Sequence, residues 1–93
     1  MKKTLYSQKD IVAGFYNPIM MSEVEPKAFA ENVRRSIVMC KDPAKLAAIH
    51  DCVLVSLGTF DDETGKLEPE KETIILDCSM LIEGLENERK ATN

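Results

Sequence analysis

The sequence has no tryptophan, a single histidine and only four residues each of glycine and proline. So few glycines and prolines exclude a collagen-like or low-complexity chain, and a hydrophobic content of 44% excludes wholesale disorder. No apolar run approaches the roughly 18 residues that a membrane-spanning helix needs. The 93 residues therefore predict one globular domain, which can bury roughly two thirds of the surface that its unfolded chain exposes.

Motifs for covalent and phosphate chemistry are also missing. No glycine-rich loop is present that would cradle a phosphate. The three cysteines, Cys40, Cys52 and Cys78, are odd in number and form no CxxC pair, so they are not a disulfide framework. The two N-terminal lysines precede no apolar stretch, which is unlike a signal peptide. These features predict a cytoplasmic protein with reduced, buried thiols.

The lone His50 is the natural starting point for a catalytic or metal site. His50 and Cys52 offer two metal ligands, with Cys40 or Cys78 as a third, but the paired spacings of zinc sites are absent. Cys78 with His50 as base is the one conceivable nucleophile pair, and Asp77 beside Cys78 would oppose the thiolate. The sequence therefore predicts no enzyme, no metal and no cofactor.

The charge of −4 is distributed unevenly along the chain. Residues 1–50 hold 8 basic and 5 acidic side chains, whereas residues 51–93 hold 4 and 11. This polarity is compatible with one basic and one acidic surface, or simply with two solvated faces that keep the protein soluble. The acidic total argues against tight duplex binding and leaves weak single-strand binding through the first half open.

The first 21 residues predict a β-hairpin. Residues 4–8 form a short strand, a turn containing Gly14 follows, and residues 15–21 form a second extended piece. Pro18 lacks an amide hydrogen, so it suits an edge position or a bulge in this second piece.

A long helix is predicted to follow the hairpin. Ser22 opens it, and Glu25 three residues later completes a capping box. Phe29, Val33 and Ile37 recur at helical spacing and form the buried stripe, with Cys40 continuing it. Asp42-Pro43 ends this helix and caps a shorter one over residues 43–50.

The second half predicts a second hairpin. Residues 52–60 are apolar on both faces, which indicates a central strand. Asp61 and Gly65 begin and close the turn, after which a strand runs from Lys66 through residues 73–78, with Pro69 interrupting it or marking an edge. A calcium loop from Asp61 is disfavoured, because the glycine stands at its fifth rather than its sixth position.

The predicted fold is a single α+β domain over residues 1–89, with a frayed tail at 90–93. Its element order is ββααββ, and residues 79–89 form an optional C-terminal helix in which Gly84 lowers the helical propensity. Strands flanking helices favour two layers: an antiparallel sheet of about four strands against one long and one short helix.

The only binding signal in the residues themselves is for single-stranded nucleic acid. Cations and aromatic rings interleave on the first hairpin, and such mixtures bind strands by charge and stacking. The candidate residues are Lys2, Lys3, Tyr6, Lys9, Phe15 and Tyr16, joined by Arg34 and Arg35 of the long helix. The alternative is that the rings pack in the core or at an edge and that the lysines protect an exposed sheet edge.

Two segments resemble a known family. The first is the opening Lys-Thr-Leu-Tyr-Ser together with residues 13–18 (Ala-Gly-Phe-Tyr-Asn-Pro). The second is the stretch from Leu57 to Pro69, which contains the hairpin Gly-Thr-Phe-Asp-Asp-Glu-Thr-Gly. Both are similar to the small nonstructural protein of gokushoviruses, which are single-stranded DNA phages of the microvirus family. The similarity spans roughly residues 3–70, including the helix around Ala28-Phe29.

The resemblance implies a non-catalytic phage protein that is located in the bacterial cytoplasm and absent from the mature virion. It implies a role in single-stranded genome synthesis or packaging, with single-stranded DNA, the replication initiator or procapsid proteins as partners. The turn residues Gly14, Pro18, Asp61 and Gly65 read as structural. The other hypothesis is a homodimeric interaction module without nucleic-acid binding, which pairs through sheet edges near Pro18 or Pro69 and the apolar run 19–21.

Overall fold

The computed structural model describes residues 1–91 of the chain, an elongated molecule of 54 × 25 × 20 Å. It contains five strands and three helices within these residues. In chain order they are β1 Lys2–Asp10, β2 Phe15–Tyr16, β3 Met20–Ser22, α1 Pro26–Met39, α2 Pro43–Ile49, β4 Cys52–Asp61, β5 Leu67–Asp77 and α3 Cys78–Ala91.

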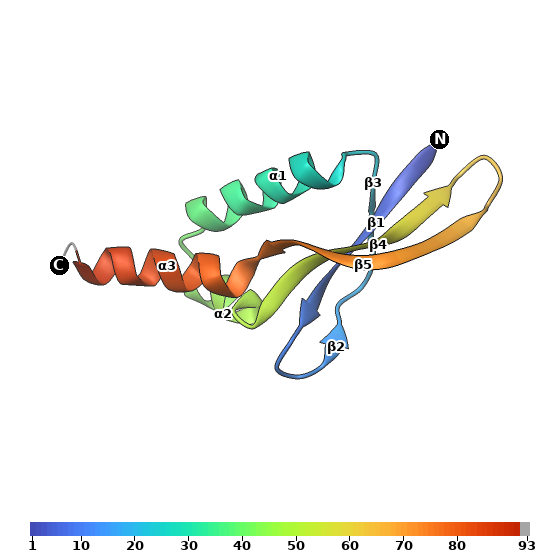
Figure 1. Ribbon diagram of the computed structural model, residues 1–93. Helices are drawn as coiled ribbons and strands as arrows, with labels where there is room; N and C mark the ends of the chain where they lie inside the picture. The colour runs from blue at the N-terminus through green and yellow to red at the C-terminus, as the bar shows by residue number, and fades with distance from the viewer. Residues whose placement is uncertain (92–93) are drawn as a thin grey trace.

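The strands form one antiparallel sheet in the order β2-β1-β4-β5, with β3 pairing the same edge of β1 as β2 does (Figure 1). β2 and β3 are the single extended piece predicted over residues 15–21, divided at Pro18, which has no amide hydrogen for the ladder. The division is fixed by Asn17, whose N–H donates to Gln8 O at 2.9 Å and whose carbonyl accepts from Ser7 Oγ at 2.7 Å. The sheet is therefore four strands wide, and the predicted α+β class is confirmed.

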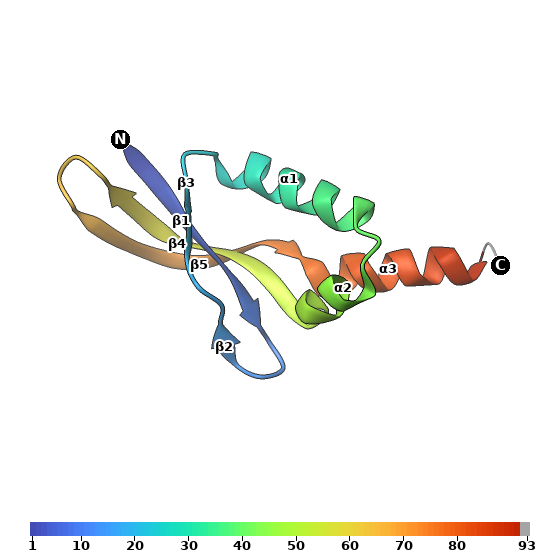
Figure 2. The same ribbon diagram turned by 180° about the vertical axis from the view of Figure 1, so that it is seen from behind.

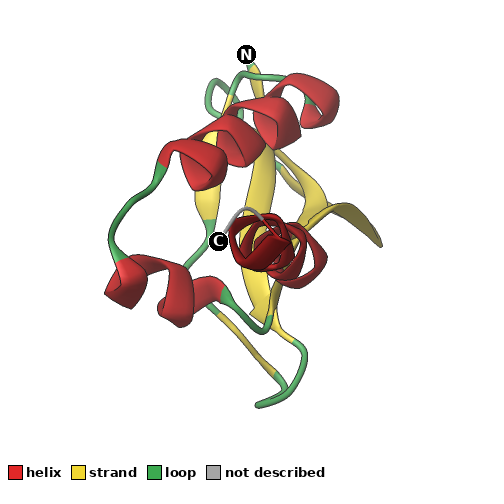
Figure 3. Ribbon diagram, turned by 90° about the vertical axis from the view of Figure 1, so that its left-hand side faces the viewer, coloured by secondary structure: helices red, strands yellow, loops and turns green. Residues whose placement is uncertain are grey.

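The central position of β4 is also confirmed, because β1 and β5 pair with its two edges. The helices gather around one end of the sheet, and the β4–β5 hairpin extends beyond them at the other end (Figures 1 and 2). Figure 3 shows α1, α2 and α3 in front of the strands when the molecule is seen along its length. The two-layer arrangement is thus confined to the helical end.

The start of α1 differs from the predicted capping box. The helix begins at Pro26, its N-cap Glu25 makes no side-chain capping bond, and Ser22 ends β3 opposite Thr4. Ser22 Oγ instead accepts from the Val24 N–H at 3.0 Å. Sheet pairing places Ser22 too early to cap the helix. The cap of α2 is as predicted, since the Asp42 carboxylate accepts from the Ala44 N–H at 3.0 Å.

The buried core joins the helices to one face of the sheet. Tyr6, Leu54 and Cys78 come from the sheet side and the start of α3, while Ile37 and Ile82 come from α1 and α3. All five are at most 4% exposed. Each large apolar side chain buried in this way stabilises the fold by roughly 1.5–3 kcal/mol relative to exposure.

The C-terminal helix forms in full. α3 follows β5 without a loop and runs to Ala91, two residues past the predicted end of the domain; residues 92–93 of the predicted tail lie outside the described part of the chain. None of the helices in the described residues has the length and apolar character needed to cross a membrane.

Gly58 marks the point where β4 and β5 come closest. The pairing register shifts at this position, where Gly58 has φ +149° opposite Pro69. A Cβ atom added to Gly58 would lie 2.2 Å from the Glu68 carbonyl oxygen, which is backbone and cannot swing away. Glycine is therefore required here by both conformation and space.

We expect Gly58→Ala to lower the free energy of unfolding by roughly 1–3 kcal/mol. Gly84→Ala is the matched control, because nothing lies within 4 Å of its added Cβ and alanine favours a helix interior; it should raise stability by about 0.5–1 kcal/mol. Urea unfolding followed by circular dichroism measures both. Equal stability of Gly58→Ala and the wild type would contradict the close approach.

Candidate nucleic-acid interface

Tyr6 corrects the predicted set of nucleic-acid-binding residues. Its side chain is fully buried, its ring stacks on Phe29 with centroids 3.9 Å apart, and its hydroxyl donates to Val24 O at 2.7 Å. Burial raises the pKa of the Tyr6 phenol. A ring held in this way cannot stack on a base, so Tyr6 belongs to the core.

The hairpin lysines are matched by carboxylates of the second half of the chain. Lys3 Nζ lies 3.5 Å from Asp62 Oδ2, and Lys9 Nζ lies 3.1 Å from Glu72 Oε2. Antiparallel pairing of β1 with β4 places the basic strand beside the acidic hairpin. Of the two interpretations of the charge distribution, the structure does not favour a separate basic surface on this hairpin, because opposite charges of the two halves meet across the sheet.

Lys9, Tyr16 and Glu72 form a cluster across the strands. Lys9 Nζ lies 5.2 Å from the centre of the Tyr16 ring, and the Tyr16 hydroxyl donates to a Glu72 carboxylate oxygen. Hydrogen bonds from Tyr16 and Lys9 lower the pKa of Glu72, and the bond to Glu72 raises the pKa of Lys9. A phosphate approaching Lys9 would have to displace Glu72.

The two exposed aromatic rings of the hairpin point to opposite faces. Tyr16 is paired with Lys9 and Phe15 with Asp10, and adjacent residues of a strand alternate between faces. Lys2 is exposed, and its charge contributes to lowering the pKa of Glu68. The predicted hairpin residues are thus real surface groups, Tyr6 excepted, but they do not converge on one site.

The helical segment carries a local surplus of positive charge. Arg34 is held by Glu31, with its Nη2 2.6 Å and its Nε 3.0 Å from the carboxylate oxygens. Arg35, Lys41 and Lys45 are exposed and make no ion pair with any described residue. Residues 26–50 hold five cations and two acids. Lys41 and Lys45 were not among the candidate residues named from the sequence. The excess of cations over residues 26–50 is the signal that could have identified them.

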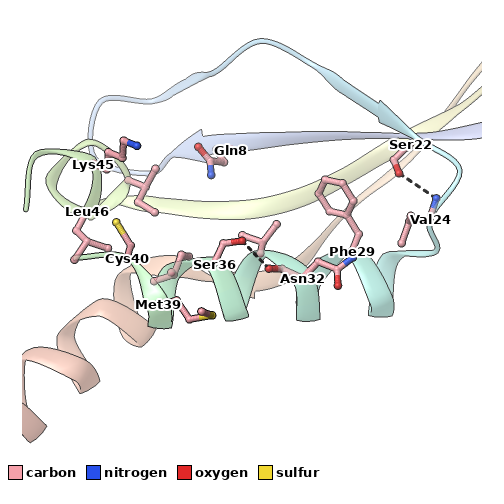
Figure 4. A pocket seen from close by; sticks show the side chains of 13 residues that line it. Gln8, Ser22, Val24, Phe29, Asn32, Ser36, Met39, Cys40, Lys45 and Leu46 are labelled. Carbon is pink, nitrogen blue, oxygen red and sulfur yellow. Dashed lines mark hydrogen bonds between the residues drawn. The ribbon is translucent and has the colours of Figure 1, made fainter. Parts of the chain in front are cut away.

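A groove lies between α1, α2 and the β1/β3 edge of the sheet (Figure 4). It has a volume of about 850 Å³. Its lining is mostly apolar, with five polar side chains that come from β1, β3, α1 and α2: Gln8, Ser22, Asn32, Ser36 and Lys45. In Figure 4, Phe29 and Leu46 lie toward opposite ends of this groove. Lys45, which makes no ion pair with any described residue, is one of the lining residues of this groove.

The reactive groups considered from the sequence are not assembled. Cys78 is fully buried, and burial raises the pKa of its thiol to about 11, with smaller contributions from Cys52 and Asp77. His50 caps the end of α2 and points its ring nitrogens at Asp51 and Glu83. Among residues 1–91, no group of three possible metal ligands comes together.

Three of the turn residues named from the sequence lie at the bends of the two hairpins. Gly14 and Gly65 have φ +78° and +73°, the left-handed conformation that glycine adopts without strain. Asp61 accepts from the Glu63 N–H at 2.9 Å, and this bond lowers the pKa of its carboxyl. Its carboxylate is thereby engaged in the turn, which explains the acidic loop without a calcium ion.

His50 makes the stability of the α2–α3 contact pH-dependent. The bond from its Nδ1–H to Asp51 raises the pKa of the imidazole, aided by the charges of Glu86 and Glu83 and opposed by desolvation. A pKa raised on folding means that protonated His50 stabilises the native state. This stabilisation is complete below the unfolded pKa of about 6.5 and is lost as pH rises through the higher folded value.

We therefore expect the wild type to lose stability relative to His50→Gln as the pH rises from about 6 to 8. Urea midpoints of both proteins across this window measure the effect. A difference between the two that does not change with pH would show that His50 has the same pKa folded and unfolded.

The comparisons with known proteins identify the family. A family model described as Phage ORF5 protein matches residues 3–81. The match extends past residue 70, where the resemblance seen in the sequence ended, so it includes Cys78 and the start of α3. No curated protein and no solved structure matches the chain. Apart from Lys2 at the start of β1, residues 3–81 contain all five strands, α1 and α2, and the chain therefore belongs to the phage ORF5 protein family.

Proposed function

We propose that this phage protein is a non-catalytic accessory factor for the synthesis or packaging of a single-stranded DNA genome, and that it acts by binding single-stranded DNA. The observation that carries the proposal is the surplus of positive charge on α1, α2 and the connection between them, where Arg35, Lys41 and Lys45 make no ion pair with any described residue. Free cations of this kind attract a polyanion, even on a protein whose net charge is −4.

A role in binding rather than catalysis is supported by the state of the candidate reactive groups. The Cys78 thiol is buried with a pKa of about 11, so it is protonated at neutral pH and a poor nucleophile. His50 is engaged with Asp51 and Glu83 on the surface of the helical end. Neither group faces the groove, whose lining contains no carboxylate.

Titration of a fluorescein-labelled oligo-dT, followed by anisotropy, tests the proposal. Release of counterions from a single strand gives a slope of about −0.7 in log affinity against log salt for each neutralised phosphate. With two to three free cations, we expect binding that weakens between roughly 50 mM and 200 mM salt with a slope of about −2. A labelled duplex of the same length is the control and should bind more weakly, because its bases are covered.

Absence of oligo-dT binding at the lowest salt would contradict DNA binding. The accessory role would then have to act through a protein partner, such as the replication initiator or the procapsid proteins.

The second candidate function is a homo-oligomeric interaction module without nucleic-acid binding. It is favoured by large apolar side chains that stay exposed on the sheet, among them Met21 at 57%, Leu67 at 57% and Ile74 at 61%. β5 adds a free edge, since only β4 pairs with it in the described chain. Exposed apolar groups beside a free strand edge are the usual elements of a sheet-mediated dimer.

Light scattering over rising protein concentration tests this alternative. In the dimer model, Ile74→Lys should shift the mass from dimer to monomer, because a charge would enter the interface. Met80→Lys is the matched control, since Met80 is 70% exposed but lies on α3 and not on the sheet. A strictly monomeric wild type, or equal dissociation by both variants, would contradict the module.

A further inference from the structure

The groove between α1 and α2 joins an apolar floor to two free cations. Phe29, Ile37 and Leu46 line its interior. Lys45 of α2 also lines it. Arg35 is not itself a lining residue, but it lies at the margin of the groove face of α1, three residues after the lining residue Asn32 and four before Met39. Cations therefore flank the groove on both helices.

The acids of this segment do not cancel those cations. Glu31 is occupied by Arg34, and the Asp42 carboxylate caps the N-terminus of α2. The pKa of Glu31 is lowered first by the hydrogen bond from Arg34, then by the charge of Arg34, and least by the charge of Arg35. The electrostatic character of the groove is accordingly positive at its edges.

The apolar and amide side chains inside the groove also suit nucleobases. A single strand exposes flat apolar base faces together with amide-like edges, whereas a duplex exposes neither face. The interior offers Phe29 and aliphatic side chains to the faces, and Gln8 and Asn32 can donate to and accept from the edges. In Figure 4 the Gln8 side chain projects from β1 toward α1, across the groove.

We propose that this groove is where a single strand binds, with bases inside it and phosphates on Arg35 and Lys45. The proposal rests on the proposed function and adds its location. This location places the DNA contact on the helices and not on the first hairpin, where Lys3 and Lys9 are already paired with Asp62 and Glu72. A phosphate gains more from a free cation than from one whose carboxylate it must first displace.

Two double variants with equal loss of charge test the location. Arg35→Gln/Lys45→Gln removes the groove cations, and Lys3→Gln/Lys9→Gln removes two paired cations from the sheet. We expect the groove variant to bind oligo-dT about tenfold more weakly or worse, with the salt slope reduced by roughly 0.7 for each lost phosphate contact. The hairpin variant should bind within about twofold of the wild type at the same salt. Circular dichroism confirms that both are folded.

A tryptophan reporter tests the same location without removing charge. The chain has no tryptophan of its own, so a single introduced tryptophan is the only source of indole fluorescence. Met39→Trp places it at the groove, where Met39 is 73% exposed, and Met80→Trp places it on α3, where Met80 is 70% exposed. Oligo-dT should quench the first by base stacking and leave the second unchanged.

The possible results separate the location from the function. Oligo-dT binding that is lost in the hairpin variant but kept in the groove variant overturns the location and leaves DNA binding intact. Absence of binding by the wild type overturns both. Poly-glutamate that binds as tightly as oligo-dT and changes the Met39→Trp signal equally shows that the groove takes an acidic polypeptide, which overturns the nucleic-acid occupant.

Discussion

The arrangement of the two layers depends on the contacts that the buried phenol of Tyr6 makes with α1 and with the segment before it. Tyr6 lies in the middle of β1, stacks on Phe29 of α1 and donates to Val24 O in the connection between β3 and α1. A buried hydroxyl without a partner costs roughly 1–3 kcal/mol, so Val24 must stay where the hydroxyl reaches it. Because both Phe29 and Val24 line the groove, this one side chain fixes the first turn of α1 and one end of the groove together.

Elements specified by neighbouring residues could be predicted from the sequence. Asp42-Pro43 caps α2, Asp61 and Gly65 shape the β4–β5 turn, and the apolar run of β4 indicates a central strand; each signal lies within a few residues. Elements that depend on distant partners could not be predicted as well. Ser22 has the spacing of a capping residue, yet its pairing with Thr4 extends the sheet to that position and moves the start of the helix to Pro26.

The candidate interface shows the same limit. An aromatic ring on a strand has the same sequence signal whether it faces the core or solvent, so Tyr6 and Tyr16 could not be separated before their partners were known. The lysines of β1 presented a similar problem. Their carboxylate partners are more than 50 residues away in the chain, and only the antiparallel register of β1, β4 and β5 brings them together. What the sequence does contain is the local surplus of cations over residues 26–50, which needs no distant partner.

The remaining acidic charge bears on how a strand would be held. Residues 51–93 carry a net charge of −7, and their carboxylates, Asp51 apart, lie on the β4–β5 hairpin and on α3. These surfaces repel phosphates, so a strand in the groove gains little by extending over the rest of the protein. Few phosphate contacts mean modest affinity and easy dissociation at physiological salt. The proposed site therefore suits the proposed accessory role, in which the protein would occupy a single-stranded genome reversibly, better than a role in which it would coat the genome permanently.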